Sequence, residues 1–183
     1  TGDECGAGTS GTGQGQFKAL SVNNPLAVGP DGTVYVGDEN RIQEFAEDGT
    51  YKGDIALPGA GLTRSLAVDP TGRIYVISAS VFESIDFGPG FRNSRVVREI
   101  SPAGAEVGRL LGEWQGRKTP IDPVAVTSDA NGNVYVSGVV VYDVPIKPGE
   151  EPKWKEFKEV VAFDSSGNLI SFELDKAGFG RPS

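Results

Sequence analysis

The stretch Pro25-Leu26-Ala27-Val28-Gly29-Pro30-Asp31-Gly32-Thr33-Val34-Tyr35-Val36 recurs in outline twice further along the chain. The second copy joins Ser65-Leu66-Ala67-Val68 to Gly72-Arg73-Ile74-Tyr75-Val76, and the third joins Pro123-Val124-Ala125-Val126 to Gly132-Asn133-Val134-Tyr135-Val136. In every copy the tyrosine follows the turn glycine by three residues. Two strand-like runs around an Asp-Gly, Thr-Gly or Asn-Gly pair predict a hairpin. We expect a longer turn in the third copy, where Ser128-Asp129-Ala130-Asn131 precedes Gly132.

A second hairpin is predicted after the first in every copy. An apolar residue stands four positions before a further glycine in each case, namely Phe45 before Gly49, Ile100 before Gly104 and Phe163 before Gly167. Strand-like stretches flank these glycines at residues 41–46 and 51–57, 96–101 and 106–111, and 159–164 and 169–174. Each copy therefore predicts four strands.

The composition also favours strands. The chain has 26 glycines and 12 prolines, and both residue types disfavour helix interiors. The first strand of each copy is a continuous apolar run, which indicates a sheet covered on both faces. A four-stranded unit that recurs about every 40 residues is typical of a β-propeller blade. The sequence therefore predicts an all-β protein, a β-propeller with three four-stranded antiparallel blades.

The first copy carries a more specific pattern in Gly15-Gln16-Phe17, Leu26-Ala27-Val28, Asp31-Gly32, Val34-Tyr35-Val36, Asp38 and Asn40-Arg41-Ile42-Gln43-Glu44-Phe45. On these residues the chain resembles the NHL-repeat β-propellers of secreted bacterial proteins, over about residues 13–177. The later copies keep the strand-turn-strand core and lack the Asn-Arg-Ile-Gln element. The resemblance implies an incomplete part of a six-bladed propeller and an extracellular or cell-surface location.

The chain accordingly divides into five parts. They are a Gly-rich leader at 1–15, blade one at 16–60, blade two at 61–113, blade three at 114–177 and a lead-in to a further blade at 178–183. The chain begins at Thr1 and contains no methionine, which indicates a processed or excised piece. We expect the missing blades in the rest of a longer parent chain, with a two-fold homodimer of half-propellers as the alternative.

Blades two and three are predicted to carry insertions between their second and third strands, at residues 79–94 and 139–157. The two turn glycines of a copy are 17 residues apart in the first copy, but 32 and 35 apart in the second and third. Equivalent loops of neighbouring blades emerge on one face of a propeller, and aromatic or arginine side chains on such loops are typical recognition anchors. The candidate partner-binding residues are Phe82, Phe87, Phe91, Arg92, Tyr142, Trp154 and Phe157. The alternative is that these aromatics fasten each loop to its own blade or extend the hairpin outward.

Residue types limit the chemistry. The chain has no histidine, which excludes Ser-His-Asp triads and most zinc or copper sites, and the histidine-dependent lyases of this fold are therefore poor templates. The run Gly6-Ala7-Gly8-Thr9-Ser10-Gly11 matches a dinucleotide motif in letters alone, without a strand before it, and is interpreted as a flexible linker. Calcium, which needs oxygen ligands, is an alternative to simple turn roles for Asp31, Asp38, Asp69, Asp129 and Asp164. No catalytic, cofactor-binding or metal-binding residue is assigned.

The charge, the cysteine content and the apolar runs of the chain indicate which kinds of partner to expect. The net charge of −8 has the wrong sign for phosphate neutralisation, so nucleic acid is not an expected partner, although Arg92, Arg95 and Arg98 form a local basic group in the sequence. Cys5 is the one cysteine and is interpreted as a free thiol, or as half of a disulfide to a partner outside this chain. No apolar run reaches the length of about 20 residues that spans a bilayer.

We therefore expect a non-catalytic extracellular scaffold that binds a protein or glycan through the inserted loops. The alternative function is part of a propeller hydrolase or lyase whose catalytic groups lie in blades not present here.

Overall fold

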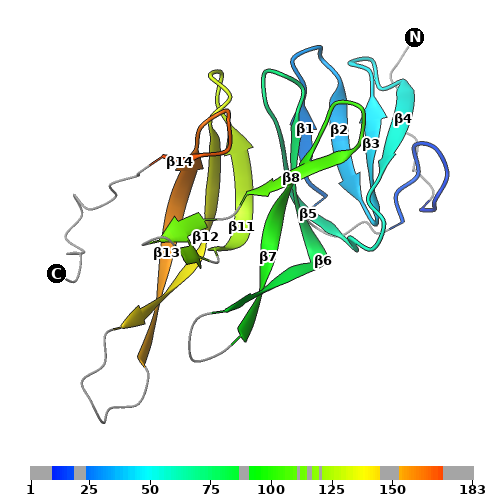
Figure 1. The fold of residues 1–183 in the computed structure, drawn as a ribbon. Coiled ribbons are helices and arrows are strands. Elements are labelled where there is room, and N and C mark those ends of the chain that lie inside the picture. Colours follow the sequence, from blue (N-terminus) through cyan, green and yellow to red (C-terminus); the bar gives the residue numbers. More distant parts are fainter. Residues whose placement is uncertain are drawn as a thin grey trace.

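The computed structural model describes the backbone of residues 10–18, 24–86, 91–110, 112–114, 117–119, 121–144 and 153–170. Its description of side chains leaves out residues 80–86, 91–94, 112–114, 117–119, 121, 139–144 and 153–159. Within the described residues the chain forms strands and no helix (Figure 1). That part of the chain accordingly contains no helix long and apolar enough to cross a membrane. The prediction of an all-β protein is confirmed.

Three four-stranded antiparallel sheets account for most of the strands, and each has its strands in sequence order. Sheet one contains β1 (Leu26–Val28), β2 (Val34–Asp38), β3 (Arg41–Phe45) and β4 (Tyr51–Ala56). Sheet two contains β5 (Thr63–Val68), β6 (Ile74–Asp86), β7 (Phe91–Ile100) and β8 (Glu106–Leu110). Sheet three contains β11 (Ile121–Ser128), β12 (Val134–Val144), β13 (Lys153–Phe163) and β14 (Leu169–Ile170). The prediction of three four-stranded antiparallel sheets is confirmed.

A short hairpin that the sequence analysis does not predict lies between sheets two and three in the chain. It consists of β9 (Gly112–Trp114) and β10 (Arg117–Thr119), which pair with each other as a separate two-stranded sheet.

Six hairpin turns, two in each sheet, share one backbone geometry. In each, the glycine N–H donates to the carbonyl three residues earlier at 2.8–3.1 Å, and that earlier residue's own N–H donates to the carbonyl four residues later at 2.7–2.9 Å. The glycine has φ of 81–84° in all six turns. This is a type I turn followed by a left-handed residue, a common hairpin geometry in which glycine avoids a Cβ clash. The glycines are Gly32, Gly49, Gly72, Gly104, Gly132 and Gly167.

The third copy does not have the longer turn that its sequence predicts. Ser128 pairs with Val134, just as Val28 pairs with Val34 and Val68 with Ile74, so the turn has the same length in every copy. The difference lies in the place of the Ala-Val word within the strand, because Ala125 stands opposite Ser137, the position that Ser65 takes opposite Ile77 in sheet two. The register shift between Pro123 and Ala125 matches the one between Thr63 and Ser65, so Ala125-Val126 lies two residues earlier in its strand than Ala67-Val68 does, with a turn and a bulge of the same kind.

Replacing Gly32 by alanine is expected to destabilise the protein by about 1–2 kcal/mol, because an alanine Cβ is disfavoured in the left-handed region. No atom lies within 4 Å of the position that a Cβ would take at Gly32, so the cost comes from the backbone and not from a clash. Gly32→Asn is the matched control, because asparagine tolerates this conformation better. Urea unfolding measures both variants, and equal losses for alanine and asparagine would contradict the turn geometry.

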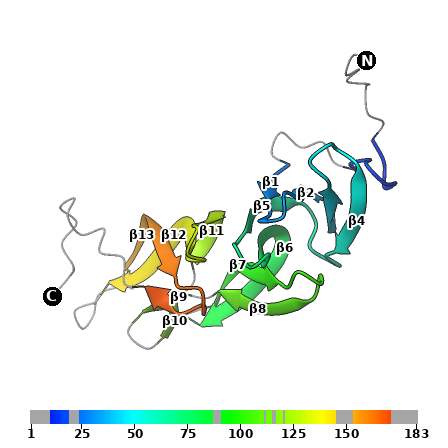
Figure 2. The same ribbon diagram turned by 90° about the horizontal axis from the view of Figure 1, so that it is seen from above.

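The core lies between successive sheets, which follow one another in chain order (Figure 2). One cluster joins sheets one and two through Tyr35, Ile42, Ile55, Leu57, Ala60, Leu66, Ile74, Val76 and Ile100. A second joins sheets two and three through Ala67, Tyr75, Ile77, Val97, Leu110, Val126, Val134, Val136 and Phe163. Alternate residues of β5 and β6 enter opposite clusters, which explains why these strands are continuous apolar runs. Sheet two is therefore covered on both faces, as the sequence predicts.

Candidate functional site

Two hairpins are much longer than their counterpart in sheet one. In sheet one, β2 and β3 end at the pair Asp38–Arg41, with two residues between them. In sheet two, the pairing of β6 with β7 continues to Asp86–Phe91, and in sheet three the pairing of β12 with β13 continues to Val144–Lys153. The inserted sequences therefore lengthen strands, and we call β6–β7 and β12–β13 the long hairpins. The expectation of inserted loops is corrected in this respect, in favour of the outward hairpin extension that stood as its alternative.

The long hairpins extend beyond the strands that flank them. The neighbours of β6 and β7 pair with them up to Ser78 and from Val97, whereas the β6–β7 ladder resumes at Phe82–Arg95 and runs outward for five pairs. In sheet three, β11 reaches Val140, and four further pairs of β12 with β13 follow. Both long hairpins point to the same side of the molecule, the lower side of Figure 1.

Most of the candidate partner-binding residues lie in the long hairpins. Their backbone partners are Arg95 for Phe82, Asp86 for Phe91, Ile85 for Arg92, Lys155 for Tyr142, Asp143 for Trp154 and Val140 for Phe157. Phe87 lies outside the described residues, as do Cys5, the first half of the Gly6–Gly11 run and the tail from residue 171. The backbone thus brings the candidates onto two neighbouring hairpins on one side of the protein.

The aspartates considered for calcium mostly hold turns. Asp69 accepts hydrogen bonds from the backbone N–H groups of Thr71 and Arg73 at 2.8 and 3.0 Å and from the Tyr75 hydroxyl at 3.1 Å. Asp129 repeats this arrangement with Asn131, Asn133 and Tyr135, and Asp164 repeats its backbone part with Ser166 and Asn168. Asp31 accepts hydrogen bonds from the N–H and the hydroxyl of Thr33. Among the residues that the structure describes, no three His, Cys, Asp or Glu side chains form a group able to hold a metal ion.

These hydrogen bonds shift the ionisation of the turn residues. The hydrogen bond from the Asn133 amide is the main cause that lowers the pKa of Asp129, and the Asn168 amide lowers the pKa of Asp164 in the same way. The hydrogen bond to Asp129 raises the pKa of Tyr135. Burial, followed by the charge of Asp69, raises the pKa of Tyr75. Carboxylates with a lowered pKa stay ionised, and keep accepting the turn hydrogen bonds, to a lower pH than an ordinary aspartate does.

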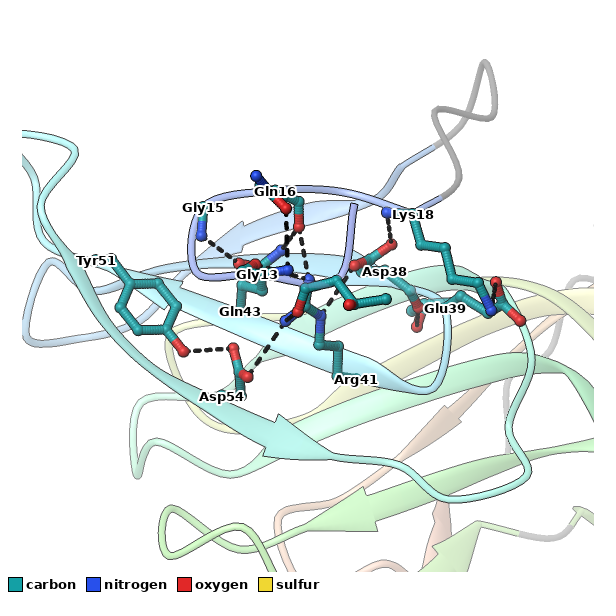
Figure 3. Close-up of polar contacts among 12 residues, drawn as sticks. Gly13, Gly15, Gln16, Lys18, Asp38, Glu39, Arg41, Gln43, Tyr51 and Asp54 are labelled. Carbon is teal, nitrogen blue, oxygen red and sulfur yellow. Dashed lines mark hydrogen bonds and ion pairs between the residues drawn. The ribbon is translucent and has the colours of Figure 1, made fainter. Parts of the chain in front are cut away.

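A polar cluster on sheet one holds part of the leader (Figure 3). The Arg41 guanidinium donates to the backbone carbonyls of Thr12, Gly13 and Gln16 at 3.0, 3.2 and 2.6 Å. Gln43, which is fully buried, donates to the Gln16 carbonyl at 2.7 Å and accepts from the Gly15 N–H at 3.0 Å. Residues 12–16, which follow the run interpreted as a flexible linker, are therefore held against sheet one.

The Arg41 guanidinium is oriented by two carboxylates. Its Nε donates to Asp38 at 3.0 Å, and its NH1 lies 3.3 Å from Asp54. The Asp38 side chain is fully buried and also accepts a hydrogen bond from the Lys18 N–H at 3.1 Å. Asp38 thus forms an ion pair and, unlike the other aspartates, does not stabilise a turn. We call Asp38, Arg41 and Gln43 the leader clamp. In the sequence these residues are visible only as part of a repeat pattern, and their role was missed because the burial of Asp38 appears only in the structure.

Asn40, the residue before the clamp arginine, joins sheet one to the start of sheet two. It has φ of 60°, which asparagine tolerates better than most residues. Its side-chain oxygen accepts from the Gly61 N–H at 2.8 Å, and its carbonyl accepts from the Leu57 N–H at 2.7 Å. Asn40, Arg41 and Gln43 of the Asn-Arg-Ile-Gln element therefore hold the segments that precede and follow sheet one, and Ile42 packs in the core.

Two of the three arginines of β7, Arg95 and Arg98, lie against carboxylates of the protein. Arg95 lies 3.0 Å from Asp122 of sheet three, and Arg98 is buried and lies 2.7 Å from Glu106. Of Arg92 the structure describes the backbone alone. The two arginines with described side chains serve contacts within the protein, which gives no support to phosphate binding.

Comparison with known proteins gives little further guidance. No protein-family model and no curated protein matches the chain. Among solved structures, it is similar to a protein of unknown function from Bacteroides caccae, whose crystal structure was determined at 1.35 Å resolution. The two share 12% sequence identity, with 80% of this chain and 79% of that chain covered and a TM-score of 0.32. A likeness this weak carries no argument, so function has to be argued from the sheets and hairpins themselves.

Proposed function

We propose that the three sheets are blades of an NHL-repeat type β-propeller and that the chain is a non-catalytic extracellular module that binds a protein or glycan through its long hairpins. The propeller assignment is supported by the repeated four-stranded sheets, the six equivalent turns and the face-to-face order of the sheets. A rigid repeat that presents variable segments on one side is a common basis for recognition.

The observation that carries the binding role is the length of the two hairpins beyond their sheets. A two-stranded ribbon is at best marginally stable in water. The pairs beyond the sheets therefore add little to the stability of the fold, and the sheets do not need them. Sheet one closes the same connection with two residues, which demonstrates that the fold does not need the extension. The extensions carry five of the seven candidate residues on described backbone, including Tyr142 and Trp154, and Phe157 stands at the base of one of them, opposite Val140.

Shortening both long hairpins is expected to abolish partner binding and to leave the sheets folded. Deleting residues 143–156 with Val141→Asn and Tyr142→Gly keeps Val140 opposite Phe157, closed by a two-residue turn. Deleting residues 85–92 with Ser84→Asn and Asn93→Gly keeps Glu83 opposite Ser94 in the same way. The probes are arrays of defined glycans and of purified extracellular proteins. We expect the wild-type chain to bind one class of probe and the shortened chain to bind it at least tenfold more weakly, a difference of about 1.4 kcal/mol.

The matched control changes the opposite end of sheet three. Ser165→Ala with Ser166→Ala alters two exposed turn residues and leaves the backbone hydrogen bonds of that turn in place. This control is expected to bind like the wild type. Undiminished binding by the shortened chain would contradict the role of the hairpins, and so would a wild-type chain that binds neither array.

A further inference from the structure

Residues 11–18 form a loop that is shaped from within, and we call this segment the leader loop. Gln16 closes a turn inside it, because its N–H donates to the Gly13 carbonyl and its side-chain oxygen accepts from the Gly13 N–H, both at 3.2 Å. A Cβ at Gly13 would lie 2.9 Å from that oxygen, and a Cβ at Gly11 would lie closer still, so either would displace the Gln16 side chain. Gly15 has φ of 67°, a conformation that favours glycine. The shape of the loop therefore depends on its own glycines and on Gln16.

The leader clamp binds this loop through main-chain atoms (Figure 3). Its guanidinium donates to three loop carbonyls, and its buried amide bonds one carbonyl and one N–H group of the loop. The Asp38 carboxylate accepts a hydrogen bond from the Lys18 N–H at 3.1 Å. Loop side chains add to these contacts at its end, where the ring centroids of Phe17 and Phe45 are 6.2 Å apart and the Lys18 ammonium lies 3.1 Å from Glu39. The clamp therefore recognises the backbone path of a segment that ends in an aromatic and a basic residue.

The clamp also has contacts that fix its arginine without the loop. The Arg41 Nε donates to the fully buried Asp38 side chain at 3.0 Å, and its NH1 lies 3.3 Å from Asp54. All three residues belong to strands of sheet one, namely β2, β3 and β4. A site that is already ordered in this way binds a partner with a smaller entropic cost than a site that must first be ordered.

The loop and the clamp meet as two separate surfaces. Their hydrogen bonds join residues that are at least 20 positions apart in the chain. The loop contacts β2 and β3, although β1 is the strand that follows the leader in the sequence. The same contacts can therefore form between the loop of one chain and the clamp of another. Exchange of an identical element between two copies is a low-cost route to association, because it needs no new contact.

We propose that the leader clamp is a docking site for a Gly-x-Gly-x-Gly-Gln-Phe-Lys segment and that it accepts this segment from a second copy of the chain. The occupant is the leader loop of the second copy, which carries every residue that the loop shape and the clamp contacts require. The chain's own leader loop competes for the clamp and so regulates access to it. The proposal does not depend on the ligand of the long hairpins.

Peptide binding to a full-length chain with a disrupted loop tests the site. Gly15→Pro excludes the φ of 67° and removes the N–H that donates to Gln43, so this variant should free the clamp. The probe is a fluorescent synthetic peptide with the sequence of residues 10–18, and fluorescence anisotropy measures its binding. We expect the Gly15→Pro chain to bind the peptide at least roughly tenfold more tightly than the wild-type chain, whose own loop competes at a high effective concentration. The matched control is the same peptide with Gly15→Pro, which should not bind.

A second variant shows that the peptide occupies the clamp. Arg41→Lys, added to the Gly15→Pro chain, should weaken peptide binding at least roughly tenfold, because lysine lacks the planar fork that reaches three carbonyls. Circular dichroism establishes that each variant has the wild-type strand content. Peptide binding that Arg41→Lys leaves unchanged would overturn the proposal, and so would a Gly15→Pro chain that binds the peptide no more tightly than the wild type.

Mixing two full-length variants tests docking between copies. The Arg41→Lys chain has an intact loop and a damaged clamp, whereas the Gly15→Pro chain has a damaged loop and an intact clamp. In sedimentation velocity, the mixture should therefore give a complex of one chain of each variant that neither variant forms alone. A mixture that sediments as its separate components would show that the clamp does not accept the loop of a second copy, and the proposal would be abandoned.

Discussion

Phe163→Ala is expected to lower the free energy of unfolding by about 3–5 kcal/mol, the usual cost of removing a buried phenylalanine ring. Phe163 is 1% exposed and packs in the cluster that joins sheets two and three. Its removal leaves a cavity between two sheets whose backbones are fixed by their ladders, so neighbouring side chains have little room to collapse into it. Denaturant unfolding followed by tryptophan fluorescence and by circular dichroism measures the loss.

Phe45 provides a matched control for Phe163. It occupies the same place in the repeat, four residues before the turn glycine, but lies on the face of sheet one that points away from sheet two and is half-buried. Its ring contacts those of Phe17 and Tyr51, with centroids 6.2 and 5.9 Å away. Phe45→Ala should therefore cost less, about 1–2 kcal/mol from partial burial and ring contacts. Equal losses for the two variants would mean that sheets two and three do not share the core described here.

The sequence predicts the hairpins well because their signals are local. A glycine at a left-handed position and the strand-forming residues around it act within a few residues, and all six turns follow from them. The length of the third turn could not be predicted in this way. The Ala-Val word at Ala125-Val126 looks equivalent to Ala67-Val68, and its place two residues earlier in the strand becomes visible only once β11 is paired with β12.

The form of the insertions was ambiguous in the sequence. Pro145, Pro148 and Pro152 indicate a loop, whereas the run from Val139 to Tyr142 indicates a strand, and in the structure that run extends the ladder of β12 with β13. Whether such a segment forms a strand depends on its pairing with another strand, and the local sequence pattern does not show that pairing. The sequence therefore located the inserted segments, whereas their strand pairing became known only from the structure.

The leader clamp was missed for a related reason. Glycine-rich sequence has no preferred conformation of its own, so residues 12–16 take the shape that their contacts impose. Those contacts come from Arg41 and Gln43, which are at least 25 residues away in the chain. From sequence alone, a charged residue in a strand is usually interpreted as exposed. Arg41 instead compensates the charge of the buried Asp38 side chain, and this burial is visible only in the structure.

Arg41→Ala is expected to lower the free energy of unfolding by about 3–5 kcal/mol and to release the leader from sheet one. Removing one partner of a buried ion pair leaves the other charge uncompensated, and the Asp38 side chain is fully buried. The same change removes the donors to three leader carbonyls. Hydrogen exchange should therefore speed up at Gly15 and Gln16, and urea unfolding measures the loss of stability.

Two further variants separate charge from geometry at the clamp. Arg41→Lys keeps the charge but loses the planar fork that reaches Asp38 and the leader at once, so it should be destabilised to an intermediate extent and still release the leader. Asp38→Asn combined with Arg41→Ala removes the stranded carboxylate and should recover part of the loss, with a coupling of about 1–3 kcal/mol. If Arg41→Ala left hydrogen exchange unchanged over residues 12–16, the leader would be held by contacts other than this cluster. Recovery of stability without recovery of exchange protection is the expected pattern, because the charge pair stabilises the strand whereas only the fork binds the leader.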